Sequence, residues 1–347
     1  MATKKTTIYE IAKIAGVSHT AVSMALNNRP GVSQATRRKI LEIASKLNYQ
    51  PNHIAKTLVT KRSYIVGLII DNIANPFFPE LTKGIEEKAN ESGYNLLLCN
   101  TGQDLEKEKK AIEMFKSKGV DGIILTTVTV DDPHIKPLIE ERFPFVCLIR
   151  HPLYPYFKNK VDYVVIDNFL GAYKGGKHLY RLGHDRIAVL TGPMNVSTAV
   201  GRTQGFKKAF EEQGITLDPS LIKECRYSRS QAYAAAVQLL KLKNRPTAFY
   251  TEDDTMAIGV RDAVLEAGLR IPEDIALVGF DNIEMSALTG VDITTIKQRK
   301  YEMGVTGVTV LIDKIEKAKP HIVNKAVLEP ELIIRKSCGY HPNGYKR

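Results

Sequence analysis

Residues 7–27 of the chain, TIYEIAKIAGVSHTAVSMALN, predict two short helices joined by a tight turn. Thr7 is placed to cap the first helix, and Gly16 follows its last apolar residue, where a helix ending in the left-handed conformation favours glycine. Ser18 then offers an oxygen to cap a second helix, which we expect to begin at His19. The first helix has one apolar stripe at spacings i, i+3, i+4 and i+7, made by Ile8, Ile11, Ala12 and Ala15.

The second helix presents a polar outer face, which is the side that a DNA major groove would contact. Val22 and Leu26 are expected to point inward, and Ser33 begins a third amphipathic helix that completes a minimal three-helix core. The same pattern also fits a corner of an ordinary helical core, so it does not establish DNA binding by itself. The outer face consists of His19, Thr20, Ser23, Met24 and Asn27.

The distribution of charge separates these two interpretations. Residues 1–62 contain 11 of the 49 lysine and arginine residues but only two of the 38 acidic residues, so nine of the net +11 charges lie there. The rest of the chain, with 38 basic and 36 acidic residues, is close to neutral. Positive charge this localised is typical of a surface that contacts phosphates. The sequence therefore predicts a DNA-binding head in front of a nearly neutral body.

The motifs of the head are specific to one family. The segments TIYEIAKIAGVS, TAVSMALNN, VSQATRRKI, LNYQPN and IAKTL resemble the N-terminal module of the LacI/GalR family of bacterial transcription regulators, the family of the lactose repressor. The resemblance implies a sequence-specific regulator, most often a repressor, whose second helix reads bases with His19, Thr20 and Met24. Met24 departs from the polar residue often found at its position. Because a thioether cannot donate to guanine, an apolar contact such as one to a thymine methyl is expected.

Other residues of the head are expected to support the DNA contact rather than to read sequence. Contacts to phosphates fix register and orientation but carry no base information. This supporting set consists of Thr7, Ser18, Ser23, Asn27, Thr36, Tyr49 and Asn52.

Residues 50–63, QPNHIAKTLVTKRS, connect the head to the body. The segment is long enough for only two helical turns, which are not stable alone in water. The resemblance identifies it as a hinge helix, in which Leu58 is wedged between base pairs in the minor groove and kinks the duplex. The residues alone favour the other interpretation, in which Leu58 is one apolar side chain in a flexible linker.

From Tyr64 onward, apolar β-branched runs alternate with amphipathic helices, which is typical of a parallel sheet covered by helices on both faces. A first series of strands is expected at residues 64–70, 94–100, 122–127 and 145–149, with helices near 77–92, 105–118 and 132–142. A second series is expected at 163–166, 186–191, 247–251 and 275–280. A helix near 300–317 and a final strand at 327–334 remain. The fold class predicted for the body is α/β, with two lobes like those of periplasmic sugar-binding proteins.

The chain is therefore expected to have three parts: a helix-turn-helix domain at residues 1–49, a hinge at 50–63 and an effector-binding and dimerisation core at 64–347. Within the core, the predicted N-lobe comprises residues 64–165 and 297–323, and the predicted C-lobe comprises 166–295 and 325–340. Three crossovers, which would form a hinge whose closure a ligand controls, are expected near Ile166, Thr295 and Val323.

Ligands of open α/β sheets bind beyond the carboxyl ends of the strands, so residues that follow the predicted strands are candidates for effector contacts. Carboxylates accept from two donors and a guanidinium donates in a fixed fork, as vicinal hydroxyls require. Asp167 and Asp253 also fit helix caps, and Phe77 and Phe78 also fit a buried core. The candidates are Phe77, Phe78, Thr126, Arg150, Asp167, Thr198, Arg202, Asp253, Asp281 and Gln298, to which the family resemblance adds Tyr227.

A sugar-responsive regulator has three alternatives, which are two other kinds of regulator and an enzyme. Val196 stands where a purine-binding member of the family has an arginine, which counts against a purine or nucleoside effector. Regulation by a protein partner, as in the catabolite control proteins of the family, stays open. Asp253, Asp254 and Asp281 could supply an acid and a base, but no catalytic motif accompanies them, so we expect no enzyme.

The expected partners are palindromic operator DNA, a small-molecule effector with a carbohydrate as the first candidate, and a second copy of the chain, because one hinge helix alone has nothing to fold against. The four cysteines are widely spaced, which predicts neither a disulfide framework nor a zinc site, and no cofactor is expected. No apolar segment follows the MATKK start and no stretch is long enough to span a membrane, which predicts a cytoplasmic protein.

Overall fold

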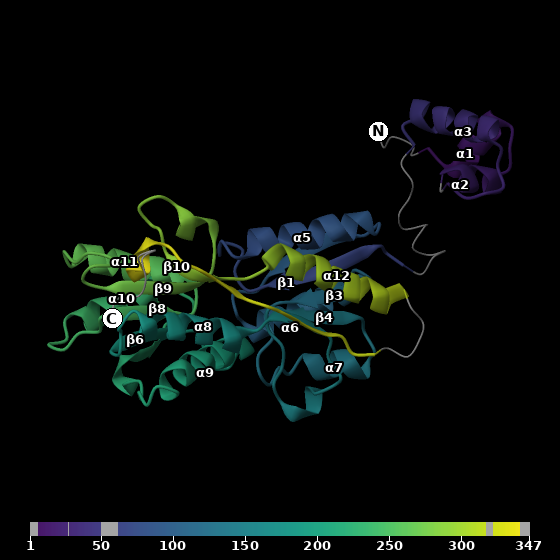
Figure 1. The fold of residues 1–347 in the computed structure, drawn as a ribbon. Coiled ribbons are helices and arrows are strands. Elements are labelled where there is room, and N and C mark those ends of the chain that lie inside the picture. Colours follow the sequence, from purple (N-terminus) through teal and green to yellow (C-terminus); the bar gives the residue numbers. More distant parts are fainter. Residues whose placement is uncertain (1–5, 27, 50–61, 317–321, 341–347) are drawn as a thin grey trace. The chain divides into compact units, whose positions relative to one another are not determined.

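The structure is a computed structural model that describes residues 6–26, 28–49, 62–316 and 322–340. The chain separates into two units, a head of Met1–Ser63 and a body of Tyr64–Arg347, and each is described by itself (Figure 1). Most of the predicted hinge at 50–63 lies outside the described residues.

The head contains three helices, α1 (Ile8–Ala15), α2 (His19–Leu26) and α3 (Gln34–Lys46). Their predicted inward faces meet in one small core, in which Ile11, Val22 and Ile40 are fully buried. The three-helix prediction for the head is therefore confirmed.

The predicted caps of the head are also present. Thr7 and Glu10 form a reciprocal capping box at the start of α1, in which each side chain accepts from the other residue's backbone N–H. Gly16 ends α1 at φ 69°, in the left-handed region that glycine tolerates without a Cβ penalty. The Oγ of Ser18 accepts from the N–H of Ala21 at 3.1 Å. These caps fix the turn between α1 and α2.

The loop after α2 is held by one arginine of α3. Arg37 donates to the side chain of Asn28 and, at 2.5 Å, to the backbone carbonyl of Arg29. A third bond, at 3.4 Å, reaches the carbonyl of Ala25 in α2 itself. Arg37 thus stabilises the fold of the head, because its guanidinium donates to groups within the protein.

The first sheet of the body has six parallel strands in the order β11-β5-β4-β3-β1-β2. Helices α5 (Phe78–Glu91) and α12 (Lys300–Glu316) pack on one face, and α6 (Leu105–Ser117) and α7 (Ile135–Glu140) on the other. We call this layer the N-lobe. Its strands are β1 (Ile65–Ile70), β2 (Asn95–Asn100), β3 (Gly122–Leu125), β4 (Phe145–Leu148), β5 (Tyr163–Ile166) and β11 (Lys325–Leu328).

The second sheet, in the C-lobe, has the order β12-β10-β9-β8-β6-β7, with only β12 antiparallel to its neighbour. Helices α8 (Asn168–Arg181) and α9 (Ser197–Glu211) cover one face, and α10 (Arg229–Leu240) and α11 (Asp254–Glu266) the other. Its strands are β6 (Ile187–Thr191), β7 (Ile222–Glu224), β8 (Ala248–Thr251), β9 (Ala276–Asp281), β10 (Thr294–Lys297) and β12 (Glu331–Ile333).

Two assignments of strands to sheets were wrong. The strand at 163–166 was expected to open the second series, but β5 pairs with β4 and β11 in the first sheet. The final strand expected at 327–334 is two strands, because β11 belongs to the first sheet and β12 to the second. Pro330 lies between them and has no N–H to continue a ladder.

These pairings move two of the expected crossovers. Thr295 lies inside β10 of the C-lobe, so the second crossover falls at residues 298–299, just before α12. The third falls at Glu329 and Pro330 instead of Val323, and residues 325–328 belong to the N-lobe instead of the C-lobe. In Figure 1 this third crossing is the yellow segment that runs between the two lobes.

Two strands, β7 and β10, were not predicted from the sequence. β7 is a three-residue edge strand, IKE, and β10 reads TTIK, so neither shows an apolar run. Both are set by pairing with longer strands of the same sheet, which a local pattern cannot express.

Candidate functional site

A cavity of about 700 Å³ opens between the two lobes of the body, at the carboxyl ends of their strands. Both lobes contribute side chains, mainly from the turns that follow β1, β3, β4, β8 and β10 and from the last residue of β9. Ten of the eleven predicted effector residues line it: Phe77, Phe78, Thr126, Arg150, Thr198, Arg202, Tyr227, Asp253, Asp281 and Gln298.

Each lobe supplies one buried arginine that is paired with a carboxylate of its own lobe. In the N-lobe, Arg150 Nη2 lies 2.9 Å from Asp71 Oδ2. In the C-lobe, Arg202 Nη1 lies 3.4 Å from Asp281 Oδ1, and the Arg202 guanidinium carbon lies 3.8 Å from the centroid of the Phe280 ring. The two buried cations of the cavity wall are therefore already neutralised within the protein.

Three buried polar atoms of the cavity residues have no hydrogen-bond partner among the described residues: Nε of Arg150, Oδ2 of Asp253 and Oε1 of Gln298. Buried polar atoms in folded proteins are nearly always satisfied, so orphaned ones indicate a missing partner. The other end of the Gln298 amide donates to Asp281 Oδ1 at 2.5 Å, which fixes the orientation of its free oxygen.

Burial raises the pKa of Asp253 well above its usual range, and the negative charge of Asp281 raises it further. The Oδ1 of Asp253 accepts from the backbone N–H of Met256 at 2.7 Å and caps α11, while Oδ2 is the orphaned atom. Asp253 is therefore a helix cap through Oδ1 and a cavity residue through Oδ2. In the neutral carboxyl, Oδ2 can donate as well as accept.

Two more buried acids lie behind the cavity wall. Burial raises the pKa of Glu252 to about 8, although the side chain accepts from Thr203 at 2.7 Å and from the Gly192 N–H at 2.8 Å. Burial, and then the charge of Asp281, raise the pKa of Asp254 to about 7. Neither residue lines the cavity, so they belong to its support.

Tyr227 forms one wall of the cavity and depends on a glycine. An added Cβ on Gly192 would lie 2.1 Å from the Tyr227 ring, so only glycine leaves room for it. The Tyr227 hydroxyl lies 2.9 Å from Thr198 Oγ1, and the Arg150 guanidinium carbon lies 5.7 Å from the ring centroid. Tyr227 therefore contacts residues from both lobes.

Asp167 does not line the cavity. Its side chain accepts from the backbone N–H of Leu170 at 2.8 Å and caps α8. The alternative interpretation of Asp167 as a helix cap is therefore the one that the geometry supports. The neighbouring Asn168 instead supports a cavity residue, because its Oδ1 accepts from Arg202 Nε at 2.8 Å.

Several lining residues were missed. Asp71 directly follows β1, so the strand-end rule that selected Thr126 and Arg150 would also have found it. Gln103 and the segment 226–230 had no such signal, because they lie in loops whose approach to the cavity depends on the packing of both lobes.

The lobes touch at points beside the cavity. The N–H of Val130 donates to the carbonyl of Asn195 at 2.8 Å, and the N–H of His151 donates to Ser197 Oγ at 3.1 Å. At the second crossover, Lys300 Nζ donates to the carbonyl of Asp281 at 3.0 Å. These three hydrogen bonds therefore connect the two lobes directly, in the arrangement that the structure shows.

The segment that follows Arg150 does not cover the cavity with its tyrosines. Tyr154 is 56% exposed and Tyr156 is 36% exposed, and neither lines the cavity. Both side chains are exposed to solvent instead.

In the head, the predicted base-reading residues lie on the accessible side of α2: His19 and Thr20 are exposed and Met24 is half-buried. Thr7 and Ser18 cap helices, and Thr36 donates its N–H to the Ser33 cap of α3. Ser23 and Tyr49 are half-buried. Asn27, Asn52 and Leu58 lie outside the described residues.

Comparisons with known proteins agree over both units. Residues 7–52 match the family described as "Bacterial regulatory proteins, lacI family", and residues 63–330 match "Periplasmic binding proteins and sugar binding domain of LacI family". The chain belongs to the LacI family. It is a DNA-binding transcriptional regulator of that family, as the sequence predicted.

Among LacI-family proteins, the chain is 37% identical to the HTH-type transcriptional regulator DegA of Bacillus subtilis (strain 168), over 96% of this chain and 98% of DegA. It is 33% identical to the HTH-type transcriptional repressor PurR of Aliivibrio salmonicida (strain LFI1238), over 95% of this chain and 98% of PurR. These relatives are transcriptional regulators.

Solved LacI-family structures share the fold. A lac repressor dimer bound to operator and the anti-inducer ONPF has a TM-score of 0.83 at 28% identity, over 96% of this chain and 99% of that chain. The complex of the regulator CelR with cellobiose has a TM-score of 0.73 at 28% identity, over 96% of this chain and 100% of that chain. None of the helices in the described part of the chain has the length and apolar character that are needed to span a bilayer.

Proposed function

We propose that this LacI-family regulator represses transcription by occupying a palindromic operator as a homodimer, and that a neutral polyhydroxylated molecule bound between the lobes changes its affinity for the operator. The observation that carries the choice of effector is the combination of orphaned polar atoms with internally paired charges. No catalytic role is assigned to the buried carboxylates.

The paired charges favour a neutral ligand. An acidic or phosphorylated effector gains most from an unpaired cation, but Arg150 and Arg202 already face Asp71 and Asp281. A hydroxyl group both donates and accepts. One hydroxyl can therefore accept from the Nε–H of Arg150, and another can donate to Oε1 of Gln298. A sugar has several such groups on one ring.

Similar proteins support a carbohydrate. The solved CelR structure contains cellobiose, and the lac repressor structures contain ONPF or ONPG in complexes that resemble this chain over 96% of its length. At 28% identity these ligands do not specify the sugar for this chain.

A purine is the second candidate effector. It is favoured by the repressors named PurR, which are 33–34% identical to this chain over 95% of its length. The Tyr227 ring and the neighbouring Phe77 and Phe78 could accommodate a flat base. Val196, where a purine-binding member has an arginine, argues against this candidate.

In this proposal, effector binding changes operator affinity through the closure of the two lobes. Gln298 and Lys300 come from the second crossover and bond to Asp281 in the C-lobe wall. A ligand that also contacts Asp281 and Gln298 therefore prefers one arrangement of the lobes. It can shift operator affinity only by the difference between its binding to the two arrangements.

For the head, we propose that His19, Thr20 and Met24 read bases while Thr7, Ser18, Ser23, Asn27, Thr36, Tyr49 and Asn52 support the phosphate contacts. The exposure of His19 and Thr20 on α2 supports this role. Leu58 is proposed as the minor-groove wedge on the family resemblance. Leu58→Ala should weaken operator binding in fluorescence anisotropy without changing the circular dichroism spectrum, and unchanged binding would exclude the wedge.

A thermal-shift screen with monosaccharides, disaccharides and nucleobases tests the effector proposal. A ligand of the cleft should raise the melting temperature of the wild type but not that of Asp281→Asn or Gln298→Ala. Arg270→Ala, which removes an exposed arginine paired with Asp274 outside the cleft, should respond like the wild type. Equal stabilisation of all four proteins would show that the ligand binds elsewhere.

A further inference from the structure

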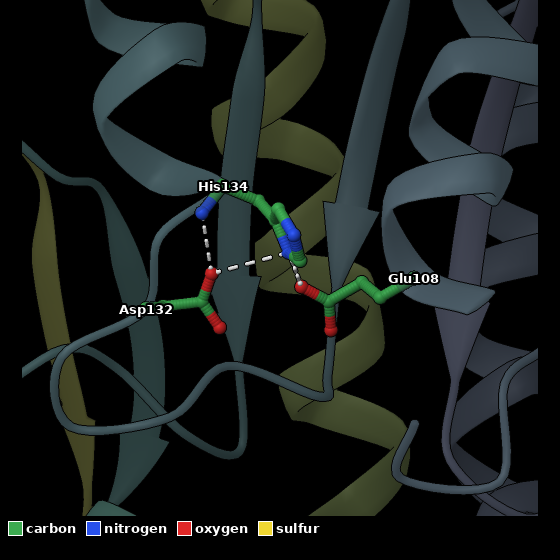
Figure 2. Close-up of side chains that lie close together, drawn as sticks. All are labelled: Glu108, Asp132 and His134. Carbon is green, nitrogen blue, oxygen red and sulfur yellow. Dashed lines mark hydrogen bonds and ion pairs between the residues drawn. The ribbon is translucent and has the colours of Figure 1, made fainter. Parts of the chain in front are cut away.

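Three side chains of the N-lobe converge at one point (Figure 2), and none of them lines the effector cleft. Glu108 comes from the first turn of α6, and Asp132 and His134 come from the loop between β3 and α7. His134 Nδ1 lies 2.9 Å from Glu108 Oε1 and 3.6 Å from Asp132 Oδ1, and the three atoms lie within 4.8 Å of one another. No residue of the effector cleft takes part.

One ring nitrogen faces both carboxylates, and Asp132 Oδ1 also accepts from the backbone N–H of His134 at 2.9 Å. Nδ1 can carry a single proton, so it can donate to Glu108 or to Asp132 but not fully to both. Asp132 is completely buried and Glu108 is 2% exposed. Among the residues that the structure describes, neither has an ion pair with a lysine or arginine. Two buried acids facing one imidazole are thus short of positive charge.

The second oxygen of each carboxylate is anchored by a threonine. Thr127 donates its hydroxyl to Glu108 Oε2, and the N–H of Thr129 donates to Asp132 Oδ2 at 3.0 Å. These bonds hold the first oxygens toward His134, as outer hydrogen bonds do for the ligands of metal sites. The three atoms are oriented before any ligand binds.

The spacing matches a metal ion. Ligand atoms about 2.0–2.1 Å from a tetrahedral zinc ion lie roughly 3.3 Å from one another. Two of the three separations, 2.9 and 3.6 Å, lie on either side of that value, and the third is within 4.8 Å. One imidazole with two carboxylates suits zinc better than calcium or magnesium, which prefer sets of oxygen ligands. The His134 side chain is 14% exposed, which gives access to solvent for entry and for a fourth ligand.

We propose that Glu108, Asp132 and His134 form a binding site for a divalent transition-metal ion of the zinc class. The sequence predicted no metal site, because Glu108 is 24 residues from Asp132 and no cysteine or second histidine accompanies them. Only the packing of α6 against the β3–α7 loop assembles the set.

The position of the site gives the metal a route to the regulator's closure. The same loop carries Val130, whose N–H donates to Asn195 of the C-lobe at 2.8 Å and whose carbonyl accepts from Leu153 and Tyr154. A metal that fixes Asp132 and His134 in this loop stiffens one of the contacts between the lobes. Zinc would then change the lobe equilibrium that the effector also acts on.

The test uses the full-length chain without an affinity tag, stripped with a chelator and titrated with zinc chloride in a calorimeter. We expect one zinc ion per chain, and a loss of affinity of at least about tenfold in Glu108→Gln, Asp132→Asn and His134→Gln. His184→Gln is the matched control, because His184 is a half-buried histidine of the C-lobe bonded to Thr247. It should bind zinc like the wild type.

Absence of stoichiometric binding by the wild type would overturn the proposal, as would unchanged affinity in the three site variants. X-ray absorption at the zinc edge of the wild type keeps the test independent of variant folding. A first shell of nitrogen and oxygen with one imidazole supports the site, whereas a sulfur ligand or two or more imidazoles contradicts it. Zinc should also slow amide exchange in residues 129–134, and equal exchange with and without zinc would remove the proposed effect on the loop.

Discussion

The Arg202 guanidinium, from α9, lies 3.4 Å from the carboxylate of Asp281, at the end of β9, and both side chains are less than 10% exposed. This buried pair is part of the cavity wall and also joins a helix to the sheet. Removing one partner leaves the other charge buried without compensation. We therefore expect a ligand bound in this cavity to be coupled to C-lobe stability through the same two residues.

Arg202→Ala is expected to lower the free energy of unfolding of the body by about 3–5 kcal/mol, because Asp281 loses its partner. The change should be measured by urea denaturation. Arg202→Ala combined with Asp281→Ala should be less destabilised than the sum of the two single variants, since no lone charge remains. Strict additivity would mean that the pair is not energetically coupled.

The raised pKa of Glu252 predicts that the stability of the body depends on pH. Its pKa is raised from 4.5 to about 8 in the folded chain, so between these pH values the folded state holds a proton that the unfolded state has released. Stability from this group is therefore present at low pH and lost as pH rises toward 8, by roughly 1.4 kcal/mol per pH unit. Denaturation at pH 6, 7 and 8 should show a flatter profile for Glu252→Gln.

Glu211→Gln, at an exposed position of α9, provides the control for this pH series. It should keep the wild-type slope. Parallel profiles for Glu252→Gln and the wild type would show that Glu252 is ionised in the folded protein across the range.

Gly192→Ala is expected to displace Tyr227, because the new Cβ would lie 2.1 Å from its ring. The displaced ring loses its hydroxyl contact with Thr198 and changes the shape of the cavity. Effector affinity, measured by calorimetry, should fall at least tenfold. Operator binding without effector should persist, since Gly192 is in the body.

Tyr227→Phe separates the ring from its hydroxyl in this experiment. Retention of most affinity in Tyr227→Phe with loss in Gly192→Ala would assign the effect to ring position. Wild-type affinity in Gly192→Ala would mean that Tyr227 does not shape the effector site.

Thr20→Ala tests base reading by α2. Loss of a base contact should cost about 1–3 kcal/mol of operator affinity and relax preference at one operator position, with little change in the salt dependence of binding. Competition binding with single-position operator variants measures this. Ser45→Ala, on the exposed side of α3, should leave both quantities unchanged. A uniform loss across all sequences would instead make Thr20 a phosphate contact.

The sequence alone determined the local features of this protein. The caps at Thr7 and Ser18, the turn at Gly16 and the apolar stripes of the head depend on neighbouring residues, so their patterns could be read directly. The long apolar strands of the body were found for the same reason. The rule that ligands bind beyond the strand ends of α/β sheets selected nine of the ten predicted residues that line the cavity, and the family resemblance supplied Tyr227.

Only the tertiary structure decided which sheet each strand joins and which acids face the cleft. β5 and β11 pair within the first sheet, and the short strands β7 and β10 exist because longer neighbours offer them hydrogen bonds. Asp167 and Asp253 follow strands in the same way. The carboxylate of Asp167 caps a helix and does not line the cavity, whereas Asp253 lines the cavity and has one oxygen without a partner among the described residues. The pairing of Asp281 with Arg202 is likewise a long-range contact, because the two residues lie 79 positions apart in the sequence.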